Sequence, residues 1–358
     1  MRFLVAMTVL LLGASARADE AKQAPPAGVP AGTDRALAPA AAVVPGVLLH
    51  GAGHWVMGEK RTARRLLLLE GVGVAVAGTS GAILYATGAS RHYAAPLVGG
   101  VVTGVGLFAL SMAADLYGSV GAACAAGAPD REPSIQLESG LGYVHDPQFA
   151  YRAFAVVAAR ARWREWEAAP SGWFALDDDN QRLRLDGAYR LAGPGTARET
   201  GDGTRLEIQT AGTMHRYGTD RFRVFTGEAA LAGRLDMVRL GRTLAGSFGE
   251  MSVGVAGEVN DYDEPGAGAD LGEMLLVRFG YGMYLGRRGE VSIYYDHRRD
   301  TFAGGTSPGP GPGSGFMGFF GAAAELRVAG RWGLRGAFES GAARVAHLAL
   351  TAEMGGSR

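Results

Sequence analysis

The segment YYDHRRD at 294–300 places aromatic, basic and acidic side chains next to one another, the combination that acid and base chemistry needs. A barrel hydrolase acting on membrane lipid would need a nucleophilic Ser, a His and a carboxylate near one rim. The candidate set is Ser292 as nucleophile, His297 as base, and Glu250 or Asp300 as carboxylate. No motif fixes this set, so we interpret the segment as part of an arginine-lined lumen paired with carboxylates.

Two further groups of side chains could bind metal ions. His50 and His54 are four residues apart and could share a helix face as ligands, but no third ligand is nearby, so we expect interfacial or capping histidines. The acidic loops 177–180 and 261–264 offer oxygen ligands without the spacing of a calcium loop. The sequence has no Walker A motif, dinucleotide fingerprint or HExxH motif. We therefore expect no catalytic site, no metal and no cofactor.

The charge balance argues against the classes of protein that recruit polyanions. Lys plus Arg number 35 and Asp plus Glu number 35 in 358 residues, so we expect no nucleic-acid partner. Gly numbers 57 and recurs inside apolar runs and at alternate strand positions, where it permits close packing and bends. Cys124 is the single Cys, so no internal disulfide can form.

The N-terminal segment has the pattern of a secretion signal. Residues 1–18 combine Arg2, an apolar run and small residues at alternate positions ending at Ala18, which is typical of a cleavable signal peptide. An uncleaved anchor helix is the competing interpretation, but the apolar run is short for a bilayer span. Residues 19–45 are rich in Ala and Pro, so we expect a disordered segment after the signal.

Two apolar runs within residues 46–121 predict an α-helical hairpin. Residues 66–87 contain one charge, Glu70, and residues 96–114 contain none, so each run is long enough to cross a bilayer as a helix. The connection between the runs is short, which makes the two helices antiparallel. A buried hairpin inside a soluble helical domain is the alternative.

Small residues on both runs would let the two helices approach closely. Gly73 with Ala77, and Gly100 with Gly104, have the small-x-x-x-small spacing of membrane helix pairs. The basic cluster at 60–65 conflicts with insertion into the inner membrane after export, because the positive-inside rule would hold it in the cytoplasm. The conflict disappears if the hairpin packs against a barrel or lies in another membrane.

The residues ahead of the first apolar run resemble a known membrane element. The segment HGAGHWVMGEKRTARRLLLLEG is similar to the opening of small bacterial two-helix membrane domains, in which Pro-Gly-x-Gly, an aromatic residue and a further Gly precede a leucine-rich helix. His50 stands at the place of that Pro. The resemblance implies membrane association and no particular chemistry. The matching positions are Gly51, Gly53, His54, Trp55, Gly58, Ala63 and the leucines at 66–69.

Residues 134–353 alternate in polarity with the period of β-strands. In 181–191 the apolar side chains take one face and the charged ones the other, and in 150–165 aromatic residues mark both ends of the apolar face. We expect a charged lumen and aromatic girdles at the membrane interfaces. The predicted lumen-facing charges are Arg160, Arg162, Arg182, Arg184, Asp186 and Arg190. The predicted girdle aromatics are Tyr151, Trp163, Tyr189, Tyr281 and Trp332.

This pattern resembles an outer-membrane β-barrel protein of the Gram-negative type. It predicts a mainly β fold, an antiparallel up-and-down barrel of about 10–12 strands preceded by the helical hairpin. A soluble sandwich or lipocalin-like barrel has the same period, with the apolar side chains inside. We expect short turns on one rim and longer loops on the other. The turns lie at 287–290, 329–331 and 340–343, and the loops near 193–203, 260–270 and 300–315.

Three functions are compatible with these patterns. We favour an exported outer-membrane β-barrel with a structural or narrow-pore role and no identifiable catalytic chemistry. The first alternative is an inner-membrane helical hairpin that anchors a soluble periplasmic β-domain. The second is a barrel hydrolase acting on membrane lipid, with His297 as its catalytic candidate. We expect the lipid bilayer, the outer-membrane assembly machinery and small solutes as partners, and the cell envelope as location, in the outer membrane, with inner membrane or periplasm as the alternative.

Overall fold

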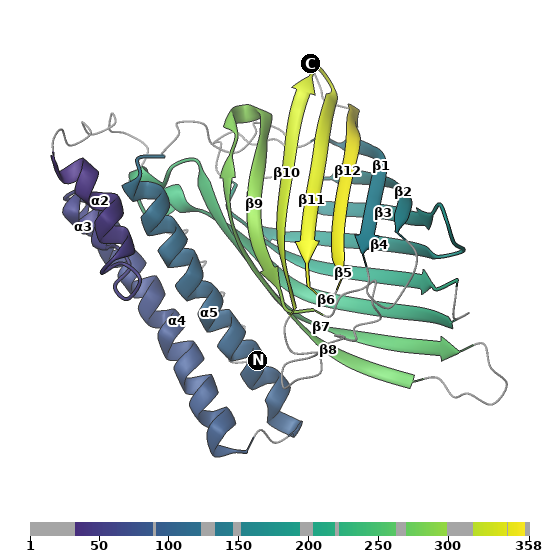
Figure 1. The fold of residues 1–358 in the computed structure, drawn as a ribbon, viewed down its shortest axis with the longest axis horizontal. Helices are drawn as coiled ribbons and strands as arrows, with labels where there is room; N and C mark the ends of the chain where they lie inside the picture. The colour runs from purple at the N-terminus through teal and green to yellow at the C-terminus, as the bar shows by residue number, and fades with distance from the viewer. Residues whose placement is uncertain are drawn as a thin grey trace.

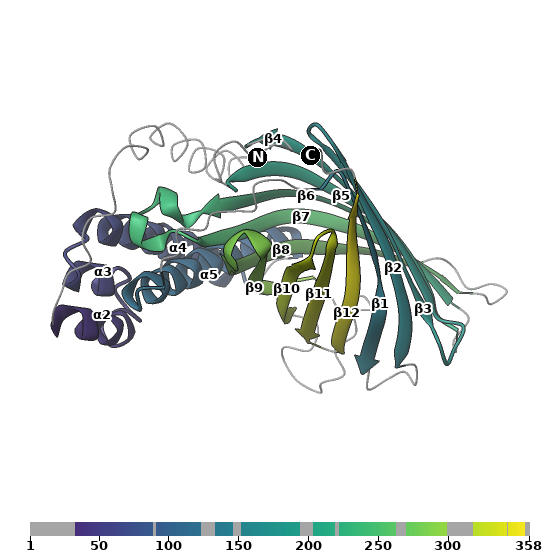
Figure 2. The same cartoon turned by 90° about the horizontal axis from the view of Figure 1, so that it is seen from above.

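The computed structural model describes residues 33–88, 91–122, 133–145, 152–193, 203–218, 222–262, 270–298, 318–341 and 343–354. They form a set of helices at the N-terminal side and a closed barrel of antiparallel strands (Figure 1). The helices lie against the outside of the barrel wall (Figure 2). The predicted signal peptide, 1–18, lies outside the described residues.

Helices occupy most of the chain ahead of the barrel. The apolar runs predicted at 66–87 and 96–114 correspond to two long helices, each of which begins earlier in the chain than its run. The bounds are Thr33–Val43 for α2, Ala52–Val56 for α3, Lys60–Ala86 for α4 and Arg91–Ser119 for α5.

Helix α2 corrects the expectation of disorder over residues 19–45. Ala38 and Ala42 of this helix are buried. Gly53 of α3 approaches α2 so closely that a Cβ added to Gly53 would lie 2.9 Å from the Ala42 Cβ. The small Ala side chains permit this close contact, and the tertiary packing stabilises a helix that composition alone does not predict. Residues 19–32 lie outside the described residues.

Twelve strands form the barrel in up-and-down order, and β1 pairs with β12 to close it. The closing pair runs in unbroken register from Ile135 opposite Met354 to His145 opposite Arg344. The predicted mainly β barrel with an N-terminal helical hairpin is confirmed. The strand bounds are Ile135–His145 (β1), Ala153–Trp163 (β2), Trp166–Ala175 (β3), Gln181–Ala192 (β4), Arg205–Arg216 (β5), Phe222–Asp236 (β6), Ser247–Tyr262 (β7), Asp270–Tyr284 (β8), Gly289–Asp296 (β9), Phe319–Ala329 (β10), Trp332–Ser340 (β11) and Arg344–Met354 (β12).

The apolar side chains of the strands face outward. Leu348 and Val255 are both 64% exposed, and Ile293 is 63% exposed. In a soluble barrel these side chains would point inward, where they would be buried. The soluble sandwich or lipocalin-like alternative is therefore wrong, because the apolar side chains of this barrel lie on its outer surface.

We name the two barrel ends the terminal rim, where β1 begins and β12 ends, and the distal rim opposite it. The expected division into a rim of turns and a rim of loops is wrong. The β4–β5 connection, predicted as a long loop, shares the terminal rim with the turns at 287–290 and 329–331. The turn at 340–343 shares the distal rim with the connections from β7 to β8 and from β9 to β10. Each strand reverses the chain direction, so a connection's place in the strand order decides its rim.

The two long helices cross at small residues. A Cβ added to Gly73 of α4 would lie 2.7 Å from the carbonyl oxygen of Gly104 on α5. Backbones this close leave no room for a side chain on either helix. This is the close approach that the spacing of small residues predicts.

Helix α5 also packs against the outer face of β8. A Cβ added to Gly99 would lie 3.1 Å from Leu275, and one added to Gly106 would lie 2.7 Å from Phe279. Figures 1 and 2 both place α4 and α5 beside the barrel wall, with α5 nearer to β8. The hairpin thus packs against the barrel, one of the two arrangements that remove the topological conflict of its basic cluster.

Both α4 and α5 are long and apolar enough to cross a membrane, judged by length and composition. Leu67 and Leu68 of α4 are exposed. The exposed basic residues Lys60, Arg61 and Arg64 lie at the start of the same helix. Apolar exposure along α4 continues the apolar outer surface of the strands.

Replacing Gly73 with Val should destabilise the hairpin by about 2 kcal/mol, because the branched side chain would push α4 away from Gly104. Gly78→Val on the same helix is the matched control, since a Cβ added there meets nothing within 4 Å. Urea unfolding in detergent micelles, followed by the helical circular dichroism signal, measures the difference. Equal effects of the two substitutions would contradict the packing assigned to Gly73.

Candidate functional site

Charged side chains bridge the barrel interior between distant strands. Arg184 on β4 donates two hydrogen bonds to Glu228 on β6, at 2.6 and 3.0 Å. Arg298, just after β9, approaches the same carboxylate to 3.2 Å. Strands β7 and β8 separate β6 from β9 in the wall, so this contact crosses the lumen. Glu228 therefore joins three parts of the wall.

A second bridge links β6 to β9. Arg234 donates two hydrogen bonds to Glu290, at 2.7 and 2.8 Å, and one to Glu250 on β7, at 2.7 Å. Its guanidinium carbon also lies 4.0 Å from the centroid of the Phe248 ring. A buried guanidinium with two carboxylates and an aromatic face is well satisfied, so this group acts as a strut between strands.

A third group of contacts spans the seam where the barrel closes. Glu138 on β1 lies 3.2 Å from Arg335 on β11 and 3.2 Å from His347 on β12. Gln136 on β1 donates a hydrogen bond of 2.7 Å to Glu325 on β10. The contacts to β10 and β11 pass over β12, so these side chains point into the lumen.

The six charges predicted to face the lumen lie in the same rows as these bridges. Four of their ion-pair distances are 3.2 Å for Arg160 with Glu167, 2.6 Å for Arg162 with Glu167, 2.8 Å for Arg184 with Asp186, and 3.2 Å for Arg190 with Glu207. Arg182 stands between Trp173 and His215 in the strand register. The sequence did not identify the partner Glu228, because partner choice depends on register and wall curvature. A role of these charges in solute passage stays a prediction.

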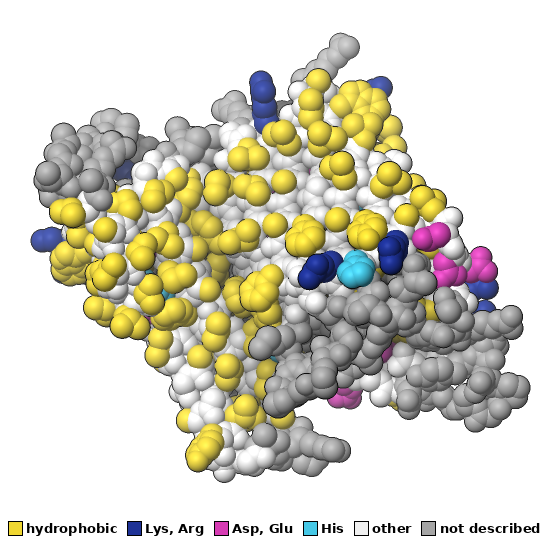
Figure 3. All heavy atoms as spheres, viewed as in Figure 1, with side chains coloured by type: hydrophobic (Ala, Val, Ile, Leu, Met, Phe, Trp, Pro, Cys, Tyr) yellow, Lys and Arg dark blue, Asp and Glu magenta, His cyan; other side chains and the backbone are white. Residues whose placement is uncertain are grey.

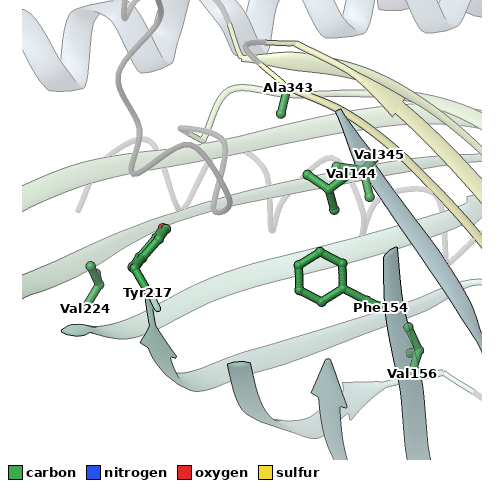
Figure 4. Close-up of a cluster of buried hydrophobic side chains, with 7 residues drawn as sticks. All are labelled: Val144, Phe154, Val156, Tyr217, Val224, Ala343 and Val345. Atoms are coloured by element: carbon green, nitrogen blue, oxygen red, sulfur yellow. The ribbon is translucent and has the colours of Figure 1, made fainter. Parts of the chain in front are cut away.

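A cluster of buried apolar side chains lies inside the barrel near the distal rim. Phe154 is fully buried, with its ring centroid 6.0 Å from that of Trp173, which in turn lies 5.4 Å from that of His347 across the seam. Figure 4 shows the buried side chains of this cluster, which come from different parts of the barrel wall. The cluster consists of Val144, Phe154, Val156, Tyr217, Val224, Ala343 and Val345, with Trp173 and Ala175 packed against it.

Exposed aromatic side chains lie on the outer surface near both rims. At the terminal rim, Trp163, Trp166, Tyr189 and Trp332 are exposed, and the rings of Trp166 and Tyr189 are 4.7 Å apart. Toward the distal rim, the exposed aromatics are Tyr143, Phe174, Phe225, Phe320 and Phe338. Figure 3 shows hydrophobic side chains spread over the face of the molecule formed by the helices and the barrel wall. This distribution matches the girdled apolar band of a transmembrane barrel.

Tyr281 is not an exposed girdle residue, contrary to the prediction. Its side chain is buried, its hydroxyl donates a hydrogen bond of 2.8 Å to Ser247, and its ring lies 6.2 Å from that of Tyr117 on α5. The alternation of the strand correctly predicts that Tyr281 points outward. It cannot predict that helix α5 covers β8. Tyr151, also predicted for a girdle, lies outside the described residues.

The residues considered for a lipid hydrolase do not assemble. His297 Nδ1 lies 2.9 Å from the Tyr295 hydroxyl, and that tyrosine packs against aromatic residues of the outer face. Ser292 belongs to the opposite row, which faces the lumen. The proposed pairing of Ser292 with His297 is therefore wrong, because the strand separates them by its two faces. Glu250 is held in the second bridge, and Asp300 lies outside the described residues.

His54 connects the helices to the barrel. Its Nδ1 lies 2.6 Å from Asp115 Oδ1 on α5, and its Nε2 lies 3.0 Å from Thr243 Oγ1 in the β6–β7 connection. Asp115 also accepts hydrogen bonds from the backbone N–H groups of Gly53 and His54, both at 3.3 Å. Asp115, His54 and Thr243 are arranged in the order of the acid, base and nucleophile of a catalytic triad. His54 and Asp115 are fully buried, however, so we assign the group a connecting role.

His50 holds the helices to one another. Its Nδ1 lies 2.6 Å from Ser111 Oγ on α5, and its backbone N–H donates a hydrogen bond of 2.8 Å to Glu70 on α4. Glu70 thus pairs with the segment ahead of the hairpin. Burial lowers the pKa of His50 below its ordinary value of 6.5, although the nearby carboxylates act in the opposite direction. Within the described ranges, no cluster of three His, Cys, Asp or Glu side chains could hold a metal ion.

Sequence reasoning did not identify Ser111, Asp115 and Thr243 as members of this cluster. Ser111 and Asp115, near the end of an apolar helix, were the available sign of a polar contact, since a buried carboxylate or hydroxyl needs a partner. Their partners are far away in the sequence, and no local pattern names them.

Comparisons with known proteins give weak likenesses. No protein-family model matches the chain, and no curated protein matches it. A KdgM porin structure has a TM-score of 0.38 at 5% identity, covering 62% of this chain and 99% of that one. The outer membrane protein Omp33 of Acinetobacter baumannii has a TM-score of 0.33 at 8% identity, covering 63% and 100%. The translocator domain of the autotransporter NalP from Neisseria meningitidis has 0.35 at 10%, covering 63% and 90%. A similarity this weak supports no statement about a solute or a function of this chain.

The helical part should lose stability as the pH falls below 6.5, because His50 takes up a proton in the unfolded chain more readily than in its buried site. In this window the unfolded state binds more protons, so stability present at higher pH declines on acidification. Urea midpoints of the helical circular dichroism signal at about pH 8 and about pH 5.5 measure the loss. His50→Gln should remove most of the difference, and an equal difference in the variant would contradict this role of His50.

Proposed function

We propose that this protein is an exported β-barrel of the outer membrane with a narrow passage for small solutes, which its own side chains restrict. The observation that supports this most is the polarity of the wall. Exposed apolar side chains such as Leu348, Val255 and Ile293 cover the outside, while arginines paired with carboxylates face the inside. Lipid accommodates the first surface, and a small-solute path suits the second. The expected partners are the lipid bilayer, the outer-membrane assembly machinery and small solutes.

The size of the barrel supports a narrow passage. Barrels of about 8 strands are filled by side chains, and those of about 16 strands leave an aqueous channel. This barrel has twelve strands, and the bridges at Glu228 and Arg234 occupy part of its interior. In this proposal the apolar cluster around Phe154 forms a constriction of the passage, the kind of element that gates a pore by excluding water. A purely structural role is the second candidate, supported by the same bridges.

The two other functions have less support. An inner-membrane anchor would leave the barrel outside the lipid layer, whereas α5 lies along β8 and the hairpin continues the apolar surface of the wall. A lipid hydrolase would need His297 beside a nucleophile, and Ser292 faces the other side of the strand.

Heat-modifiable gel migration together with cell fractionation tests the membrane barrel. Unboiled protein should migrate differently from boiled protein, because a closed barrel resists unfolding by detergent, and it should sediment with the outer membrane. A soluble β-domain anchored by the hairpin would give no gel shift and would sediment with the inner membrane.

Planar-bilayer recording tests the passage. The wild-type barrel should give a low conductance, and Phe154→Ala should raise it at least about twofold, because loss of the ring widens the apolar constriction. Val157→Ala is the matched control, since Val157 lies on the outward face of the same strand and should leave conductance unchanged. If neither the wild type nor Phe154→Ala conducts, the narrow-pore proposal fails and the structural role replaces it.

A further inference from the structure

Two pairs of basic side chains lie on the outer surface at the distal rim. Arg216 at the end of β5 stands directly opposite Arg223 on β6. His145 at the end of β1 stands directly opposite Arg344 at the start of β12. All four side chains are exposed. They occupy the outward rows of their strands, together with exposed apolar residues such as Leu348.

The first pair places two guanidinium groups side by side, and the second places an imidazole beside a guanidinium. Side chains directly opposite one another on antiparallel strands are about 5 Å apart at Cβ, and like charges in this arrangement are destabilising. Asp261 on β7 faces Arg223 from the other side and compensates one guanidinium of that pair. A bound anion would offset the positive charge that remains at Arg216 and at Arg344.

The basic pairs lie at the level of a membrane interface. Tyr143 is exposed two residues before His145, and Phe225 is exposed two residues after Arg223, so each pair is one outward-facing step beyond an aromatic side chain. One such step is about 7 Å along a strand. Aromatic side chains mark the boundary of the hydrocarbon layer, so the pairs stand among headgroups. Figure 3 shows a His side chain between Lys or Arg side chains at the edge of the apolar surface.

We infer that these two basic pairs bind the phosphate groups of glycolipid headgroups in the leaflet at the distal rim. The inference rests on the proposed outer-membrane location and on an orientation that places the distal rim at the cell exterior, where the leaflet carries phosphorylated sugar headgroups. Both rims carry turns and loops, but the longest connection between two strands, from β9 to β10, lies at this rim, and long connections are typical of the outward-facing side. A guanidinium forms bidentate hydrogen bonds with phosphate, and two adjacent cations reach a single phosphate group.

Binding of diphosphorylated lipid A to the full-length protein in detergent micelles tests this inference. Arg216→Gln/Arg223→Gln and His145→Gln/Arg344→Gln should each remove one of the two sites and lower the amount of lipid A bound at saturation about twofold, and the combination of all four substitutions should weaken binding about tenfold. The matched control is Arg61→Gln/Arg64→Gln, which removes two exposed cations from α4 and should leave the affinity unchanged. Arg216→Lys/Arg223→Lys keeps the charge and should retain most of the affinity. Dephosphorylated lipid A and phosphatidylglycerol serve as comparison lipids, and both should bind the wild type more weakly.

Heat-modifiable migration, measured on each variant, separates failure of this inference from failure of the proposed function. Variants that keep the gel shift but bind lipid A like the wild type would overturn the phosphate site and leave the membrane barrel intact. A loss of equal size in the Arg61→Gln/Arg64→Gln control, or equal wild-type affinity for phosphatidylglycerol, would also overturn it. Absence of a gel shift in the wild type would defeat the proposed barrel location itself.

Discussion

Closure of the sheet by pairing of β1 with β12 is the constraint on which the rest of the structure depends. A hydrocarbon layer offers no water to an unpaired backbone N–H or C=O group, so a sheet within it has to be free of edges. The register between β1 and β12 is continuous over both strands, from Ile135 opposite Met354 to His145 opposite Arg344. Closure gives every strand an inner and an outer face, and the alternation of side chains then separates charge from apolar surface.

The closed wall brings charges of distant strands into contact, and their pairing keeps the interior stable. A buried guanidinium is unfavourable unless carboxylates and further hydrogen bonds replace its water. Arg234 meets this condition with Glu250 and Glu290, and Arg184 meets it with Glu228 and Asp186. The same side chains lie inside the barrel and link strands that are not neighbours in the wall.

The helical hairpin extends the apolar surface of the barrel and is held by shape and by a few polar contacts. Lipid supplies no hydrophobic force between apolar surfaces, so close backbone approach has to provide much of the attraction. Gly104 on one side of α5 meets α4, and Gly99 and Gly106 on the other side meet β8. At the terminal rim, His54 joins α3 and α5 to the β6–β7 connection. This contact fixes where along the wall the hairpin sits.

The sequence by itself determined the helical hairpin, the strand-rich half and the two faces of the strands, since apolar runs and period-two alternation are local properties of the chain. Local reasoning failed where contacts from elsewhere decide the outcome, as for helix Thr33–Val43, which packs on α3, and for Tyr281, which α5 covers. Alternation also separates Leu348 from His347 without saying which of them points inward. Only the tertiary structure decided that, together with the partners of Glu228 and Asp115, because barrel closure and strand register bring together residues that no short stretch of sequence connects.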